Sequence, residues 1–126
     1  MHLGNHLIID FFGCKSFEFN SCRDLEKHMP ALVKKAGGTV VQVTFHEFIP
    51  HGTSGVVVIA ESHVTIHTWP EHETACVDVF SCGTKLNVSG LIEDLKNLLG
   101  AQTHLSKDFK RGEIGQVVTL PHKKAV

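Results

Sequence analysis

The chain has 126 residues, of which 42% are apolar, a formal net charge of -1 and a pI near 6.8. This length predicts a single domain with its own core, and the near-neutral charge argues against partners such as nucleic acids or membrane surfaces. No run reaches the roughly 18 apolar residues of a membrane span, and the start, which contains Asp10, predicts a strand rather than a signal peptide. We therefore expect a cytoplasmic protein.

Runs of β-branched and aromatic residues, most of them alternating with polar residues, predict the strands of this protein. In chain order they are expected at residues 2–12, 39–49, 55–60, 63–68 and 74–80, with weaker ones at 102–109 and 116–120. Two runs with helical spacing interrupt them, one between Asn20 and Ala36 and one at residues 88–99.

Both predicted helices have an apolar stripe and a glycine stop. The stripe of the first comprises Leu25, Met29, Leu32, Val33 and Ala36, before Gly37 and Gly38. Pro30 lies inside this helix, and because an interior proline costs about 3 kcal/mol we expect a kink or a restart there. Asn87 or Ser89 is a suitable cap for the second helix, which Gly100 ends and whose apolar face comprises Leu91, Ile92, Leu95, Leu98 and Leu99.

The order of these elements predicts an α+β fold, because strands outnumber helices and follow one another through short connections. We expect one domain over residues 1–126: an antiparallel β-sheet with two helices packed on one face, forming a two-layer α/β sandwich. The other face of such a sheet is a natural surface for a second subunit.

The cysteines and histidines give no metal signature. The four cysteines, Cys14, Cys22, Cys76 and Cys82, form no CxxC pair and should be reduced in the cytoplasm, with Cys76 expected in the core. The ten histidines are scattered, without an HExxH motif. We therefore expect no bound metal, although a histidine-rich metal-binding module is an alternative that metal analysis would test.

The most informative segment is SGVVVIAESHVTIHTWPE, residues 54–71, in which Glu61 and Ser62 lie between two predicted strands. A serine hydroxyl can attack the carbonyl that precedes it and convert the peptide bond into an ester. That step requires a strained peptide bond and a donor for the oxyanion, and a base must then remove the serine α-proton. For the dipeptide alone, an ordinary turn is the usual interpretation.

A much longer string changes this interpretation. GNHLIIDFFGC, FHEFIPHGTSGVVVIAESHVTIHTWPE and the CVDVFSCG block closely resemble the small prokaryotic S-adenosylmethionine decarboxylase proenzymes. The resemblance covers nearly the whole chain and is loosest from Thr103 onward. It implies self-cleavage between Glu61 and Ser62, giving a β chain of residues 1–61 and an α chain of residues 62–126 that begins with a covalent pyruvoyl group made from Ser62.

The resemblance also assigns roles in processing and catalysis. His67 matches the histidine that acts as proton acceptor in processing, a role that suits its usual pKa near 6.5. Ser54 matches the hydroxyl that assists processing, and Cys82 matches the proton donor of the decarboxylation. In an unbroken strand Ser62 and His67 would point to opposite faces, so their cooperation requires a turn or bulge between Glu61 and His63.

Two further positions match the substrate pocket of the family. Phe48 matches the aromatic ring that stacks on adenine, and Glu71 matches the carboxylate that accepts both ribose hydroxyls. The second stacking ring is left open among Phe11, Phe12 and Trp69.

The resemblance implies a carboxy-lyase. The pyruvoyl ketone forms an imine (Schiff base) with the amine of S-adenosylmethionine and accepts the electrons left by carbon dioxide. The product would be the aminopropyl donor of spermidine, a polyamine, and the family implies a homodimer of αβ units with the site at the subunit interface. Two alternatives stay open: an arginine or ornithine decarboxylase on the same scaffold, and an uncleaved, inactive partner subunit.

Overall fold

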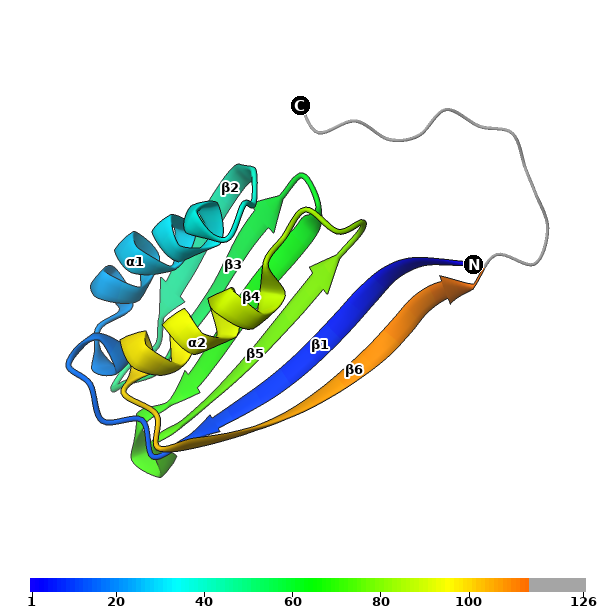
Figure 1. Cartoon of the computed structure of the whole chain (residues 1–126). Coiled ribbons are helices and arrows are strands. Elements are labelled where there is room, and N and C mark those ends of the chain that lie inside the picture. The colour runs from blue at the N-terminus through cyan, green and yellow to red at the C-terminus, as the bar shows by residue number, and fades with distance from the viewer. Residues whose placement is uncertain (114–126) are drawn as a thin grey trace.

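A computed structural model describes residues 1–113, and it consists of two layers (Figure 1). Six strands form one antiparallel sheet in the order β2-β3-β4-β5-β1-β6, and two helices lie on the same face of it. The elements are β1 (His2–Phe12), α1 (Cys22–Lys35), β2 (Val40–Glu47), β3 (Thr53–Ile59), β4 (Ser62–Trp69), β5 (Thr74–Ser81), α2 (Val88–Leu99) and β6 (Thr103–Glu113). The predicted α+β sandwich is confirmed, while the strand expected at 116–120 lies outside the described residues.

Helix α1 begins where Ser21 accepts a hydrogen bond from the Asp24 amide at 3.1 Å, and it packs on β2 and β3. It continues through Pro30, so the expected restart does not occur. Leu25, Met29 and Val33 are fully buried on both sides of the proline, and this packing holds the two halves of the helix on one surface.

Helix α2 follows its predicted caps and apolar face. Asn87 accepts a hydrogen bond from the Gly90 amide at 3.1 Å, and Gly100 ends the helix in the left-handed conformation. The fully buried face consists of Leu91, Leu95 and Leu99. Within residues 1–113, neither helix has the length and apolar character required to cross a lipid bilayer.

Alternation along the strands decides which side chains enter the core and which reach the other face. On β4, Val64 and Ile66 are fully buried beneath the helices, so His63 and His67 lie on the opposite, uncovered face. We call this the open face. It carries polar groups, and also half-exposed apolar side chains from three strands: Ile8, Phe12, Val56, Val58 and Trp69.

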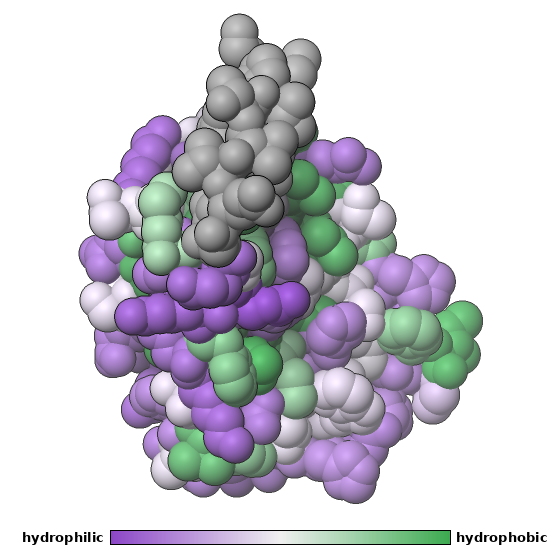
Figure 2. Space-filling model, turned by 90° about the vertical axis from the view of Figure 1, so that its right-hand side faces the viewer, coloured by the Kyte–Doolittle hydropathy of each residue, from purple (hydrophilic) through white to green (hydrophobic). Residues whose placement is uncertain are grey.

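β6, one of the two edge strands of the sheet, is protected by charge against pairing with a further strand. Its middle and end read SKDFKRGE, and almost every residue of the strand is exposed. Figure 2 views this side of the molecule and shows hydrophilic residues in a band broken by small hydrophobic patches. Charged side chains discourage a further strand from pairing with such an edge, so this edge is a poor surface for association.

Candidate active site

The expected cleavage point lies at a sharp turn between β3 and β4. Ile59 pairs with Ser62, so Ala60 and Glu61 form the tip of this turn. Ser62 has a φ angle of 141°, in a region that residues with a side chain rarely adopt. Such conformations typically cost about 1–3 kcal/mol and persist only where neighbouring groups hold them. The peptide bond between Glu61 and Ser62 therefore adjoins a strained residue.

Cys82 contacts both sides of this peptide bond. Its backbone amide donates a hydrogen bond to the Glu61 carbonyl oxygen at 2.8 Å. Its Sγ atom lies 3.2 Å from Ser62 Oγ. The carbonyl that Ser62 would attack thus already has one hydrogen-bond donor, as an oxyanion at that position requires.

The side chain of Glu61 is also held in place. Its Oε1 atom accepts a hydrogen bond from the Thr39 amide at 3.0 Å, and Lys85 Nζ lies 3.7 Å from Oε2. The carboxylate is only 10% exposed, whereas Lys85 is 63% exposed. Solvent weakens the ion pair, so we regard the Thr39 hydrogen bond as the stronger restraint.

A second group of expected site residues surrounds a cleft at the other end of β4. Ser54 Oγ and His67 Nδ1 lie 2.8 Å apart, and both line a cleft of about 300 Å³ together with Phe48, Trp69 and Glu71. Glu71 Oε1 lies 3.6 Å from His51 Nδ1. The structure therefore gathers four of the expected residues, Ser54, His67, Phe48 and Glu71, in one place.

The cleft distinguishes among the three candidates for the second aromatic ring. Trp69 lines the cleft and is 43% exposed. Phe11 is fully buried beneath the helices, where no ligand can reach it. Phe12 lies on β1 and is not among the residues around the cleft. Trp69 is thus the candidate that can face a ligand beside Phe48.

The two groups do not meet within one chain. Ser62 is the first residue of β4, and five residues along a strand separate Cα atoms by roughly 16 Å, so His67 lies far from it. A turn is present at Ala60 and Glu61, but β4 then pairs without a register shift from Ser62 to Trp69, so this turn does not bring Ser62 and His67 together. It places Ser62 beside Cys82, while His67 lies beside Ser54 on the open face.

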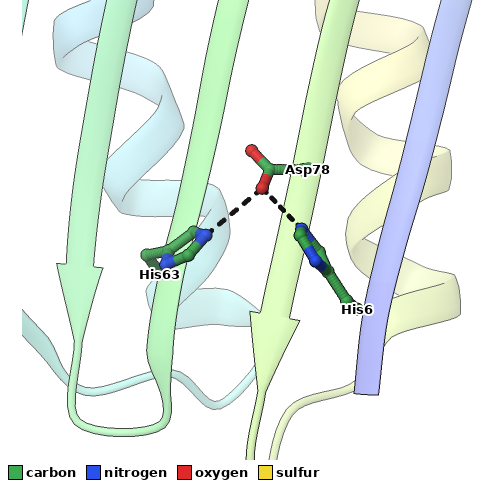
Figure 3. Close-up of side chains that lie close together, drawn as sticks. All are labelled: His6, His63 and Asp78. Carbon is green, nitrogen blue, oxygen red and sulfur yellow. Dashed lines mark hydrogen bonds and ion pairs between the residues drawn. The ribbon is translucent and has the colours of Figure 1, made fainter. Parts of the chain in front are cut away.

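One cluster on the open face was not foreseen from the sequence. Figure 3 shows His6 from β1 and His63 from β4 pointing at Asp78 from β5. Asp78 Oδ2 lies 2.7 Å from His6 Nε2 and 3.2 Å from His63 Nε2. Arg111 Nη1 lies 3.1 Å from the other ring nitrogen of His6. These residues are far apart in the chain, and no local pattern links them.

The surroundings of Cys14 and Cys76 raise the pKa values of their thiols. Burial raises the pKa of Cys14 to about 11, and that of Cys76 is also raised to about 11, by burial and then by the neighbouring Asp10 carboxylate. Cys76 was expected in the core, but this was wrong. It is half-buried on the open face, because Ala75 and Val77 occupy the core positions of β5.

The chain matches a known protein family along most of its length. The family model described as S-adenosylmethionine decarboxylase matches residues 5–112. This chain belongs to the S-adenosylmethionine decarboxylase family. The resemblance noted in the sequence is thereby confirmed, and the match includes both groups of site residues.

Members of the S-adenosylmethionine decarboxylase family match along most of their length. The S-adenosylmethionine decarboxylase proenzyme of Thermotoga maritima is 42% identical over 98% of both chains. That of Pseudomonas paraeruginosa is 44% identical over 87% of this chain and 69% of its own length. The crystal structure of the adenosylmethionine decarboxylase from Aquifex aeolicus superposes with a TM-score of 0.82 at 30% identity, covering 94% of this chain and 98% of that one.

Proposed function

We propose that this member of the S-adenosylmethionine decarboxylase family is a proenzyme that cleaves itself between Glu61 and Ser62. The products are a β chain of residues 1–61 and an α chain of residues 62–126. The mature protein decarboxylates S-adenosylmethionine, the substrate named for its relatives. The observation that carries the proposal is the strained Ser62, whose preceding carbonyl oxygen binds the Cys82 amide at 2.8 Å.

Breaking the chain requires only groups of the protein itself, and water enters in the last step, which makes the ketone. Ser62 Oγ attacks the carbonyl carbon of Glu61, the C–N bond breaks, and an ester forms while the Cys82 amide stabilises the oxyanion. Removal of the Ser62 α-proton then expels the Glu61 carboxylate from Cβ and leaves dehydroalanine. Its enamine tautomerises to an imine, and water hydrolyses it to a ketone and ammonia. We assign the removal of protons during processing to His67, assisted by Ser54, which lies 2.8 Å from it.

The place of Ser62 suits the pyruvoyl cofactor that would form there. Such a group supplies an electron sink for the electrons that carbon dioxide leaves behind. Cys82 Sγ, 3.2 Å from Ser62 Oγ, is close enough to deliver a proton to a substrate carbon held at this position.

All four cysteines are free thiols, and because the cytoplasm keeps thiols reduced, we place the enzyme there.

The cleft provides the contacts that a nucleoside requires. Phe48 and Trp69 line the cleft and can offer aromatic faces to adenine, and the Glu71 carboxylate can accept hydrogen bonds from two neighbouring hydroxyls of a ligand. These residues favour S-adenosylmethionine over arginine or ornithine, which have no ring to stack. Decarboxylation of the adenosyl substrate would supply an aminopropyl donor for polyamine synthesis.

We further propose that two αβ units stack through their open faces and form a homodimer with shared sites. The uncovered apolar side chains of this face suit burial against a second sheet about 10 Å away. We place the two-fold axis midway between the two stacked sheets and perpendicular to the strands, so that the strands of the two protomers run in opposite directions. It would bring the Ser62 end of β4 over the His67 end of the partner's β4. Each site would then combine Ser62 and Cys82 of one protomer with Ser54, His67, Phe48 and Glu71 of the other.

The shared site predicts complementation between two defective variants. Cys82→Ala and Glu71→Ala should each lose most decarboxylation when purified alone. Co-expressed, they should recover about a quarter of the wild-type rate, because random pairing makes half the dimers mixed and gives each mixed dimer one intact site. Decarboxylation is measured as carbon dioxide released from S-adenosylmethionine. No recovery, despite isolation of the mixed dimer with two different tags, would contradict the shared site.

The proposed function itself is tested by the intact mass of the purified protein under denaturing conditions. We expect two fragments that meet between Glu61 and Ser62, with the larger one lighter by one ammonia than a chain starting with serine. Carbon dioxide should be released from S-adenosylmethionine and not from arginine or ornithine. A single 13.9 kDa species after long incubation would point instead to an inactive partner subunit.

A further inference from the structure

We propose that Asp78 and the side chain of Glu61 are positioning residues for self-cleavage. Each holds a residue that borders Ser62, and together they keep Ser62 in its strained conformation. This inference rests on the proposed self-cleavage and adds to it two restraints outside the reacting atoms. It concerns the rate of processing rather than the decarboxylation that follows.

The restraint before the cleaved bond is the carboxylate of Glu61. It is 10% exposed, and the Thr39 amide donates to it at 3.0 Å. Thr39 directly precedes β2, and its carbonyl accepts a hydrogen bond from the Ala60 amide at 2.9 Å. Lys85 reaches the same corner and donates to Thr39 Oγ1 at 3.0 Å. The turn is therefore attached to the neighbouring edge of the sheet through both its backbone and its side chain.

The restraint after the cleaved bond is the contact between His63 and Asp78. Asp78 lies on β5 and accepts hydrogen bonds from His63 of β4 and His6 of β1, at 3.2 Å and 2.7 Å (Figure 3). These three strands are neighbours in the sheet. The His63 ring also stacks on Phe80, with centroids 5.7 Å apart. The residue that follows Ser62 is thus attached to the centre of the sheet.

The contacts of this cluster favour hydrogen bonding over metal binding. Arg111 Nη1 lies 3.1 Å from His6 Nδ1, and a guanidinium can only donate, so this nitrogen carries no proton. With Nδ1 as acceptor, His6 donates a hydrogen bond from Nε2 to Asp78 at 2.7 Å. A metal ion bound at Nε2 would require the opposite tautomer and would set the Nδ1 proton against Arg111.

Restraints on both sides of Ser62 make the peptide bond before it easier to open. With a φ angle of 141°, Ser62 could relax only by rotating the adjoining backbone, and that rotation would break contacts of Glu61 or His63. Opening the Glu61–Ser62 amide to an ester removes this constraint. The restraints therefore raise the energy of the amide relative to the ester and favour the first step of cleavage.

The test follows processing of newly made protein. Full-length chains are labelled by a pulse of cell-free synthesis, and the loss of uncleaved protein is followed on denaturing gels. Asp78→Ala and Glu61→Ala should each cleave about tenfold more slowly than wild type, as expected if about 1.4 kcal/mol of ground-state strain is relieved. Asp78→Asn and Glu61→Gln, which each keep an acceptor oxygen, should recover part of the rate.

Matched controls remove carboxylates elsewhere. Asp108→Ala on β6 and Glu93→Ala on α2 should cleave at the wild-type rate. Hydroxylamine cleaves esters, so it measures the fraction of chains in which the Glu61–Ser62 amide has become an ester. A positioning role predicts a smaller ester fraction in the variants, whereas a general loss of stability predicts a lower melting temperature. Asp78→Ala and Glu61→Ala should show less hydroxylamine-sensitive protein than wild type, while their melting temperatures in a Ser62→Ala background stay close to that of the background.

The outcomes separate this inference from the proposed function. Wild-type cleavage rates in both alanine variants would overturn the positioning role and leave self-cleavage intact. Slow cleavage of the alanine variants would also overturn the positioning role in either of two cases. The first is that their hydroxylamine-sensitive fraction equals that of wild type. The second is that their melting temperatures in the Ser62→Ala background fall in proportion to the loss of rate. Slower wild-type cleavage with chelator present would overturn the hydrogen-bonded interpretation of the histidine cluster. Failure of wild type to cleave at all would reject the proposed function first.

Discussion

Replacing Ser62 by alanine should abolish processing and leave one uncleaved chain of residues 1–126. Alanine has no hydroxyl to attack the Glu61 carbonyl, so neither the ester nor the ketone can form. Decarboxylation should fall to background, because the electron sink is absent. The measurement is the intact mass after long incubation, paired with carbon dioxide release from S-adenosylmethionine.

The matched control for this variant is Ser106→Ala, which removes an exposed hydroxyl from β6 and should process normally. The Ser62→Ala protein should also keep its fold, since the Cys82 amide can still bind the Glu61 carbonyl. Appearance of the two fragments in Ser62→Ala would contradict the proposed chemistry, because a protease would then have to be responsible.

Replacing Cys82 by alanine should separate the two reactions. Its backbone amide, which contacts the Glu61 carbonyl, is retained, so the chain should still divide at Ser62. The thiol 3.2 Å from Ser62 Oγ is lost, and a missing general acid typically costs about 10²–10⁴ in rate. We therefore expect normal fragment masses with decarboxylation reduced by at least about a hundredfold.

Cys22→Ala is the control, because this half-buried thiol begins α1 and lies outside both groups of site residues. It should retain the wild-type decarboxylation rate. Undiminished carbon dioxide release from processed Cys82→Ala would show that another group protonates the substrate. Loss of processing in this variant would instead show that the thiol itself takes part in cleavage.

Features that depend on near neighbours were predictable from the sequence. The bounds of α2 and its Gly100 stop were correct, and of the two expected caps, Asn87 and Ser89, the structure has Asn87. Capping and helical spacing involve residues within about four positions of each other, which makes them predictable. Alternation over residues 63–68 likewise predicted the strand that the structure shows as β4. The long string around Glu61 and Ser62 predicted the family, which the comparisons confirm.

Features that depend on strand order and register required the tertiary structure. Ser62 and Cys82 meet although β4, the connection after it and β5 separate them in the sequence. The cluster of His6, His63 and Asp78 exists only because β4, β5 and β1 are neighbours. The core position expected for Cys76 was wrong, because the alternation of β5 puts Ala75 and Val77 in the core. Which of the two faces of a strand is covered is decided by the packing of the helices on the sheet.

The sequence by itself therefore determined most of the elements, the layer architecture and the family, and it supplied the residues that we propose to carry the chemistry. Only the tertiary structure decided how those residues are grouped, with Ser62 and Cys82 at one end of β4 and His67, Ser54 and the cleft at the other. The physical reason is that periodicity and caps are set by local interactions. Pairing between distant strands is set by the packing of the whole core, which no short segment encodes.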